Sequence, residues 1–207
     1  ENMRLGAIRG VVTDADGSVL VNWYDEWDIA PPTPVSLGLN NVNADVSATC
    51  NGMTRAMARA AKGSFTPETK IIALAGDNLY DKLIGHPQVR QTYLNWQAAA
   101  ALREGLEGAA FGSFNYGGIH WVNYRGSDDG AVGISPNEAQ LFPVGARGIF
   151  QVAWSPGESL DWVNTPGREI YAIQVPDTAR KAWVDVEVYS YPLYICTCPQ
   201  VLLRAEL

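Results

Sequence analysis

Charged residues are scarce in this sequence: they make up 18% of its 207 residues, whereas a typical soluble domain has about 25%. Lys and Arg number 15 and Asp and Glu number 22, which gives a formal net charge of −7. This balance excludes a nucleic-acid-binding protein that relies on net positive charge. The hydrophobic content of 47% also argues against a disordered chain.

Long hydrophobic runs are absent, and no stretch approaches the about 20 apolar residues that a membrane-spanning helix needs. The longest helix-like run of small apolar residues, 97–110, is interrupted by Arg103, Glu104 and Glu107. No basic segment followed by an apolar one is present, so no signal peptide is predicted. Because the sequence opens with Glu1 instead of Met, we expect a processed product or a fragment with missing upstream residues.

Cysteine is also rare, with only Cys50, Cys196 and Cys198. Zinc and thioredoxin-like sites need a C-x-x-C pair with further ligands nearby. A single residue separates Cys196 from Cys198, and none of Cys50, His86 and His120 stands at ligand spacing from them. We therefore predict buried free thiols and no metal site, which implies a reducing compartment during folding.

The first half of the sequence predicts two helical regions with a strand between them. Apolar residues recur every three or four positions over 44–62, as is typical of an amphipathic helix. A short apolar run at 71–75, bounded by Gly76, indicates a buried strand. Pro87 divides the second helical region, 77–104. The other expectations are a hairpin over 8–24 and a Pro-rich connector over 30–41.

From residue 111 onward the pattern changes to short strands. Residues 114–126 predict a hairpin around Gly117 and Gly118. Over 182–191, valine alternates with acidic residues, as in a strand with one apolar face. Further strands are predicted at 148–156, 168–176, 193–198 and 201–203. A helical first half and a β-rich second half predict an α+β fold.

No motif of catalysis or cofactor binding is complete in this sequence. Asp77 follows a strand and opens a helix, where backbone amides can hold an anion, but the glycine spacing of a dinucleotide or phosphate loop is missing. A helix cap is the simpler role for Asp77. His86 precedes a proline in a helix break and His120 lies in a hairpin strand, so each is better explained by packing or exposure than by general-base catalysis. We predict no catalytic residue, no metal ligand and no cofactor; the alternative is a small-ligand-binding protein or enzyme with a site near Asp77 and His120.

Tryptophan and tyrosine are frequent, with seven and nine copies. They could form a stacking platform for carbohydrate or RNA. Five of the tryptophans stand at core-like positions of patterned segments: Trp23, Trp96, Trp121, Trp154 and Trp183. Packing in a core or a subunit interface is the simpler interpretation. Together with the low charge, it favours association of the chain with copies of itself.

Five segments give a more specific indication. They are LGAIRGVVTDADGSVLVNWYDEW (5–27), DNLYDKLIGHPQVRQTYLNWQAAAALREG (77–105), FNYGGIHWVNYRG (114–126), FPVG (142–145) and PLYICTCPQVLLRAEL (192–207). In this order, and over almost the whole chain, they resemble the lambda-type major head protein of tailed bacteriophages, the major capsid protein E family. These segments are family signatures and not catalytic motifs, so the resemblance carries no active-site residue.

The resemblance implies a Hong Kong 97-type capsid fold. Its peripheral lobe would be residues 1–70 together with 176–207, and its axial lobe residues 71–175. The implied function is that of a non-enzymatic structural protein of a phage or prophage, which self-assembles into pentamers and hexamers of an icosahedral shell around the DNA genome.

The resemblance also implies partners and locations. The partners would be further copies of the chain together with head-decoration, scaffold and portal proteins. Neither membrane binding nor specific nucleic-acid binding is implied. The locations would be the virion capsid and the bacterial cytoplasm during assembly.

One departure from the family concerns the N-terminal end. The family has an extended arm, a long β-hairpin loop and most of a spine helix upstream of the segment matching 5–27, and we expect these to be missing here. Since the arm and the loop reach over neighbouring subunits, we expect this piece alone to be a monomer or a small oligomer. A tail or connector component, which forms rings or tubes, is a third interpretation.

Overall fold

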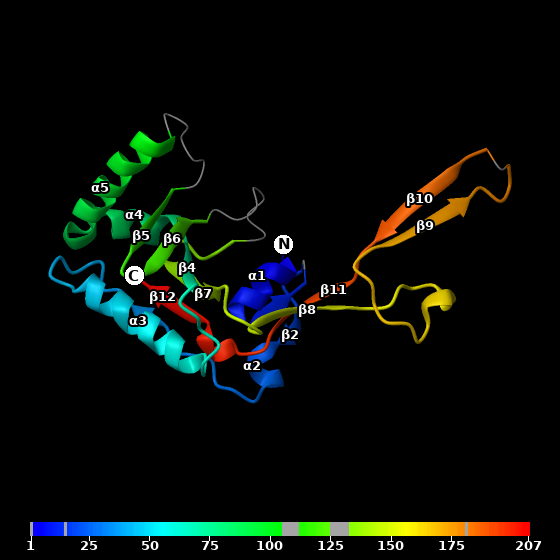
Figure 1. The fold of residues 1–207 in the computed structure, drawn as a ribbon, viewed down its shortest axis with the longest axis horizontal. Coiled ribbons are helices and arrows are strands. Elements are labelled where there is room, and N and C mark those ends of the chain that lie inside the picture. Colours follow the sequence, from blue (N-terminus) through cyan, green and yellow to red (C-terminus); the bar gives the residue numbers. More distant parts are fainter. Residues whose placement is uncertain (1, 15, 105–111, 125–132, 181) are drawn as a thin grey trace. The chain divides into compact units, whose positions relative to one another are not determined.

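The computed structural model describes residues 2–14, 16–104, 112–124, 133–180 and 182–207, without the side chains of 96–104. The chain divides into two compact units (Figure 1). The larger unit is Glu1–Ile149 with Cys196–Leu207, and the smaller unit is Phe150–Ile195. Helices and strands occur together, which confirms the α+β prediction.

The larger unit is built around a six-stranded sheet with the order β3-β12-β7-β4-β6-β5. Its strands are β3 (Val35–Ser36), β4 (Lys70–Ala75), β5 (Ser113–Tyr116), β6 (Ile119–Asn123), β7 (Glu138–Val144) and β12 (Leu203–Glu206). The pairs β3–β12 and β4–β6 are parallel, and the others are antiparallel. The last strand of the chain therefore lies inside the sheet, between strands from its first and middle parts.

Three helices share a hydrophobic core with one face of this sheet: α3 (Val46–Ala60), α4 (Asp77–Gly85) and α5 (Pro87–Glu104) (Figure 1). Trp121 and Phe114 are fully buried on the sheet side, and they are paired across β5 and β6. Cys50 and Met57 are fully buried on α3, and Leu79 on α4. The predicted helix over 44–62 is confirmed with slightly narrower bounds.

The opposite face of the sheet contacts the N-terminal segment. This segment forms α1 (Asn2–Arg9), the hairpin of β1 (Val11–Thr13) and β2 (Val19–Asn22), and α2 (Trp23–Glu26). The amide Nε2 of Gln140 on β7 donates to the carbonyl oxygen of Ile8 at 3.1 Å. The hairpin predicted over 8–24 is present, but its two ends are helical because Gly10 with a φ of 83° ends α1 and Asn22 caps α2.

The β5–β6 hairpin turns at Gly117 and Gly118, as predicted. Both glycines have positive φ, 60° and 76°, which a two-residue turn of the right twist requires. A Cβ atom on Gly117 would also lie 2.4 Å from the Cβ atom of Cys50 on α3. Glycine at position 117 therefore allows both the turn and the close approach of the helix.

Two predictions about local structure are wrong. Asp77 is the first residue of α4 and Gly76 occupies the cap position, because the preceding strand continues to Ala75. The strand predicted at 201–203 begins only at Leu203, since Pro199–Val201 form a short 3-10 helix, η2.

The smaller unit consists of two-stranded pairings and a short helical turn. β8 (Phe150–Trp154) pairs with β11 (Pro192–Cys196), and β9 (Tyr171–Pro176) pairs with β10 (Val184–Tyr189). The turn η1 (Leu160–Trp162) lies between β8 and β9 in the sequence. These strands confirm the β pattern predicted from residue 148 onward.

The two units are defined by contacts within one chain, whereas the predicted lobes are defined by their place about a capsomer axis. The six-stranded sheet takes strands from both predicted lobes, 1–70 with 176–207 and 71–175. The division into lobes stays a prediction.

Candidate functional site

The two residues of the alternative site prediction, Asp77 and His120, lie toward opposite ends of neighbouring strands. β4 and β6 are parallel, and His120 is paired with Ile72 near their start. From Ile72, β4 continues for three more residues to Ala75, a rise of about 10 Å. Asp77 comes after Gly76, beyond the end of the strand. The structure therefore does not bring these two side chains into one site.

The histidine side chains have structural partners. Nδ1 of His120 lies 2.7 Å from Oδ1 of Asn115 on the adjacent strand β5. His86 is buried at the end of α4, and its Nε2 lies 3.2 Å from the carbonyl oxygen of Asn41. The backbone N–H of Gln88 donates to its Nδ1 at 3.4 Å. Both rings thus join neighbouring segments of the larger unit, which agrees with the packing interpretation.

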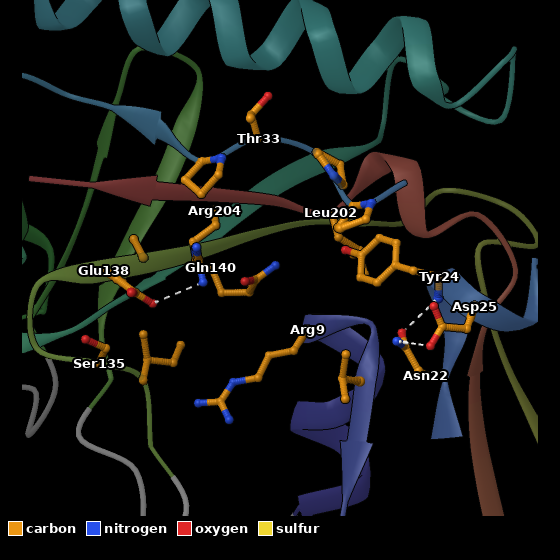
Figure 2. A pocket seen from close by; sticks show the side chains of 16 residues that line it. Arg9, Asn22, Tyr24, Asp25, Thr33, Ser135, Glu138, Gln140, Leu202 and Arg204 are labelled. Atoms are coloured by element: carbon orange, nitrogen blue, oxygen red, sulfur yellow. Dashed lines mark hydrogen bonds and ion pairs between the residues drawn. The ribbon is translucent and has the colours of Figure 1, made fainter. Parts of the chain in front are cut away.

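A cleft of about 750 Å³ opens on the larger unit beside α1, over the face of β7 and β12 that carries Gln140 and Arg204 (Figure 2). Its polar lining includes Arg9 from α1, Glu138 and Gln140 from β7, and Arg204 from β12. The remaining lining residues are Val11, Asn22, Tyr24, Asp25, Pro31, Pro32, Thr33, Pro34, Ile134, Ser135, Ala139 and Leu202. The residues come from segments far apart in the sequence, so no local motif could have predicted this cleft.

Of the four charged lining residues, Glu138 and Arg204 form an ion pair with each other. Arg204 lies 3.3 Å from a carboxylate oxygen of Glu206 and 4.0 Å from one of Glu138. Nδ2 of Asn22 donates to Oδ2 of Asp25 at 2.6 Å (Figure 2). Partial burial lowers the pKa of Arg9, but the guanidinium remains charged at neutral pH.

The ionisable side chains of the lining are two carboxylates, two guanidinium groups and the phenol of Tyr24. Histidine and cysteine are absent from the cleft residues that the structure describes. Glu138 is paired with Arg204. Within the described part of the chain, no hydrogen bond joins its carboxylate to the hydroxyl of Ser135 or Thr33.

Two of the three thiols are buried as predicted, whereas Cys198 is half-buried. Cys50 and Cys196 are fully buried, and burial raises the pKa of each thiol to about 12. All three cysteines are free. Over the described ranges, no cluster of three or more His, Cys, Asp or Glu residues is arranged to hold a metal ion. The described helices also include none that is long and apolar enough to cross a membrane.

The tryptophans divide into core and surface residues. Trp23 and Trp121 are buried in the larger unit, as predicted. Trp183, just before β10, is 55% exposed, so it is not packed in the core of the single chain, and the predicted alternative of a subunit interface stays a prediction. Trp154 is half-buried, and the side chain of Trp96 lies outside the described residues.

The carboxylate of Asp45 joins two helices. Its Oδ1 accepts hydrogen bonds from the backbone N–H of Ala48 at 2.9 Å, as the cap of α3, and from Nε2 of Gln88 in the first turn of α5 at 3.0 Å. The bond from Gln88, followed by that from Ala48, lowers the pKa of Asp45. The charged form of Asp45 therefore stabilises the folded chain.

This arrangement predicts an acid-dependent contribution to stability. The contribution of Asp45 is present above the pKa of an unfolded Asp, about 4, and is lost as the pH falls further through the lower folded-state pKa. We expect Asp45→Asn to unfold close to wild type at neutral pH, since Asn caps helices as well as Asp does. Urea unfolding from about pH 5 down to about pH 3 should then show a smaller loss of stability for the variant than for wild type. An identical acid dependence in both proteins would contradict the role of Asp45.

Comparisons with known proteins give consistent results. The sequence model of a protein family described as "Phage major capsid protein E" matches residues 1–207. The major capsid protein of Salmonella phage Felix O1 is 30% identical over 233 residues, which cover 98% of this chain and 62% of that protein. The major capsid protein of Pseudomonas phage KPP10 is 26% identical over 148 residues, which cover 66% of this chain and 42% of that protein.

A solved structure of a prophage protein shares the fold. The crystal structure of a protein assigned as the capsid protein of an Escherichia coli CFT073 prophage matches with a TM-score of 0.55 and 11% sequence identity. The match covers 99% of this chain and 61% of that chain. This chain thus spans less than two thirds of the length of each relative that it matches here.

Proposed function

The chain belongs to the phage major capsid protein E family, and we propose that it is the body of a shell subunit of a tailed phage or prophage. The observation that carries the proposal is the match of the family model to all of residues 1–207. The function is structural: copies of the subunit assemble into pentamers and hexamers of an icosahedral shell that encloses the DNA genome.

The fold proposed for the subunit is of the Hong Kong 97 type. In it, residues 1–70 with 176–207 form the peripheral lobe, and residues 71–175 form the axial lobe, whose loops surround the capsomer axis. The α+β architecture and the fold shared with the prophage protein support this proposal. Because the six-stranded sheet draws on both segments, the two lobes would share one core.

The partners follow from the same role. They are further copies of the chain and the scaffold, head-decoration and portal proteins of the phage. The net charge of −7 leaves the shell without strong electrostatic attraction for DNA, so the enclosed genome is held by containment. Assembly takes place in the bacterial cytoplasm, and the product resides in the virion.

Expression of the whole open reading frame that encodes this chain tests the proposal. Lysates are fractionated on a density gradient, and the fast-sedimenting fraction is imaged by negative-stain electron microscopy. We expect closed particles of uniform diameter. Small soluble particles alone, or rings and tubes, would contradict a shell function.

A further inference from the structure

The smaller unit contains a ribbon of only two strands. β9 and β10 are antiparallel, and Val184–Tyr189 is in register with Tyr171–Pro176. Their sheet has two strands among the described residues. In Figure 1, β9 and β10 lie side by side as a long ribbon. A two-stranded ribbon has little stability of its own in water, and packing against a further element stabilises it.

One face of this ribbon is uncharged, mostly apolar and exposed. Residues that are paired across the two strands lie on the same face, and successive residues alternate between faces. We call one face the valine face; it consists of Ala172, Gln174, Pro176, Val184, Val186 and Val188, all of them exposed. Val184, Val186 and Val188 are 54%, 65% and 63% exposed. Trp183, the neighbour of Val184 in sequence, adds further exposed apolar surface.

The other face of the ribbon is different. It carries the acidic residues Asp185 and Glu187, and it is partly covered, since Tyr171 is buried and Ile173 is half-buried. The hydroxyl of Tyr189 donates to a carboxylate oxygen of Glu187. In a soluble protein, the valine face of such a strand pair would be expected to pack against the protein core, and the acidic face would be expected to contact water. Here the valine face is the one that is left uncovered, so it is the face that needs a partner.

The net charge of the chain indicates which kind of partner covers the valine face. Two copies that each carry a net charge of −7 repel one another wherever acidic surfaces meet. The valine face has no ionisable side chain, so two copies of it approach without like-charge repulsion. The same face on both partners also satisfies the symmetry of a two-fold interface, in which one patch meets its own copy.

We propose that the valine face is a subunit contact, in which the β9–β10 ribbon of one copy packs face to face against the same ribbon of a second copy. The inference rests on the proposed shell function and assigns it a contact surface. In this contact Val186, at the centre of the β10 pattern, lies close to its own counterpart. The two ribbons stack at the usual spacing of packed sheets, about 10 Å.

Cross-linking tests the geometry directly. Val186→Cys places a thiol on the valine face, and Asp185→Cys places one on the opposite face of the same strand. The whole gene product carrying each variant is treated with a short bis-maleimide and separated on a denaturing gel. We expect covalent dimers from Val186→Cys and far fewer from Asp185→Cys. Wild type is the background control: Cys50 and Cys196 are buried with raised pKa values, and any reaction of the half-buried Cys198 is common to all three proteins.

A charge variant tests the energetics. Val186→Glu places a carboxylate at the centre of the contact, whereas Thr178→Glu adds the same charge at the exposed turn of the same hairpin. We expect association to weaken by more than about tenfold for Val186→Glu and to change little for Thr178→Glu. Unfolding curves are expected to match for both variants, because position 186 is 65% exposed in the single chain.

The outcomes separate this inference from the proposed function. If wild type forms shells while Val186→Cys gives no more dimer than Asp185→Cys, the valine-face contact is wrong and the shell function stands. If the Val186→Cys variant forms specific dimers without shells, the contact stands and the shell function fails. If the thiol introduced at position 186 is shielded from a monofunctional maleimide in shells but gives no dimer, another part of the assembly covers the valine face, which also overturns the proposal.

Discussion

Replacing Trp121 with alanine is expected to lower the free energy of unfolding of the larger unit by about 4 kcal/mol. Trp121 lies on β6, fully buried, with Ala73 beside it on β4 and Phe114 beside it on β5. Its indole N–H donates to the carbonyl oxygen of Tyr116 at 3.3 Å. Truncation removes a large apolar surface at the centre of the core and leaves a cavity that the paired strands cannot close. Urea unfolding followed by circular dichroism measures the loss.

Trp183→Ala is the matched control for this prediction. The same side chain is removed, but Trp183 is 55% exposed, so the free energy of unfolding is expected to change by less than about 1 kcal/mol. Equal losses for the two variants would contradict the assignment of Trp121 to the core and of Trp183 to the surface. If Trp183 flanks the proposed subunit contact, its variant also weakens association while the stability of the single chain is kept.

Gly76→Ala is expected to destabilise the larger unit by about 3 kcal/mol. The φ of Gly76 is −72°, so its conformation suits any residue. The constraint is space, because a Cβ atom there would lie 2.3 Å from the carbonyl oxygen of Ser135 and 2.6 Å from the Cα atom of Pro136. Backbone atoms cannot rotate away as a side chain can. The variant must therefore separate the start of α4 from the segment before β7, where the N–H of Leu79 donates to the carbonyl oxygen of Pro136.

Gly85→Ala makes the same chemical change at the other end of the same helix. No atom lies within 4 Å of a Cβ at Gly85, and alanine favours the helical conformation over glycine by up to about 1 kcal/mol. We expect this variant to be as stable as wild type or slightly more stable. Denaturant midpoints for the two variants should move in opposite directions, and a loss at both positions would show that the close contact at Gly76 is not the cause.

Local patterns in the sequence predicted the helices and hairpins well. The spacing of Val46, Cys50, Met53 and Met57 follows one helix face, and all four side chains are buried on α3. The turn at Gly117 and Gly118 has the positive φ values that a tight hairpin needs. Such features depend on residues within a few positions of one another, which is why the sequence reveals them.

Other features depend on contacts between distant segments. β7 was not predicted as a strand, although it pairs with β4 inside the sheet, with Pro143 opposite Ile71. The place of β12 between β3 and β7 joins the end of the chain to residue 35. The cleft around Arg9 and Glu138 arises from this same non-local pairing, so no spacing of residues could have indicated it.

The alternating valines of 182–191 show the difference between predicting a strand and predicting its environment. The pattern correctly indicated β10 as a strand with one apolar face. In the single chain that face is exposed. Alternation indicates only that one face is made for burial, and the element that covers it can belong to another molecule.

A cryo-electron microscopy reconstruction of the particles formed by the whole gene product is the most direct test of the central claim. A shell subunit predicts an icosahedral map in which the six-stranded sheet, with α3, α4 and α5 on one face, fits repeatedly into rings of five and six. A map of particles whose shell is built from another protein, or a product that yields no closed particle, would contradict it.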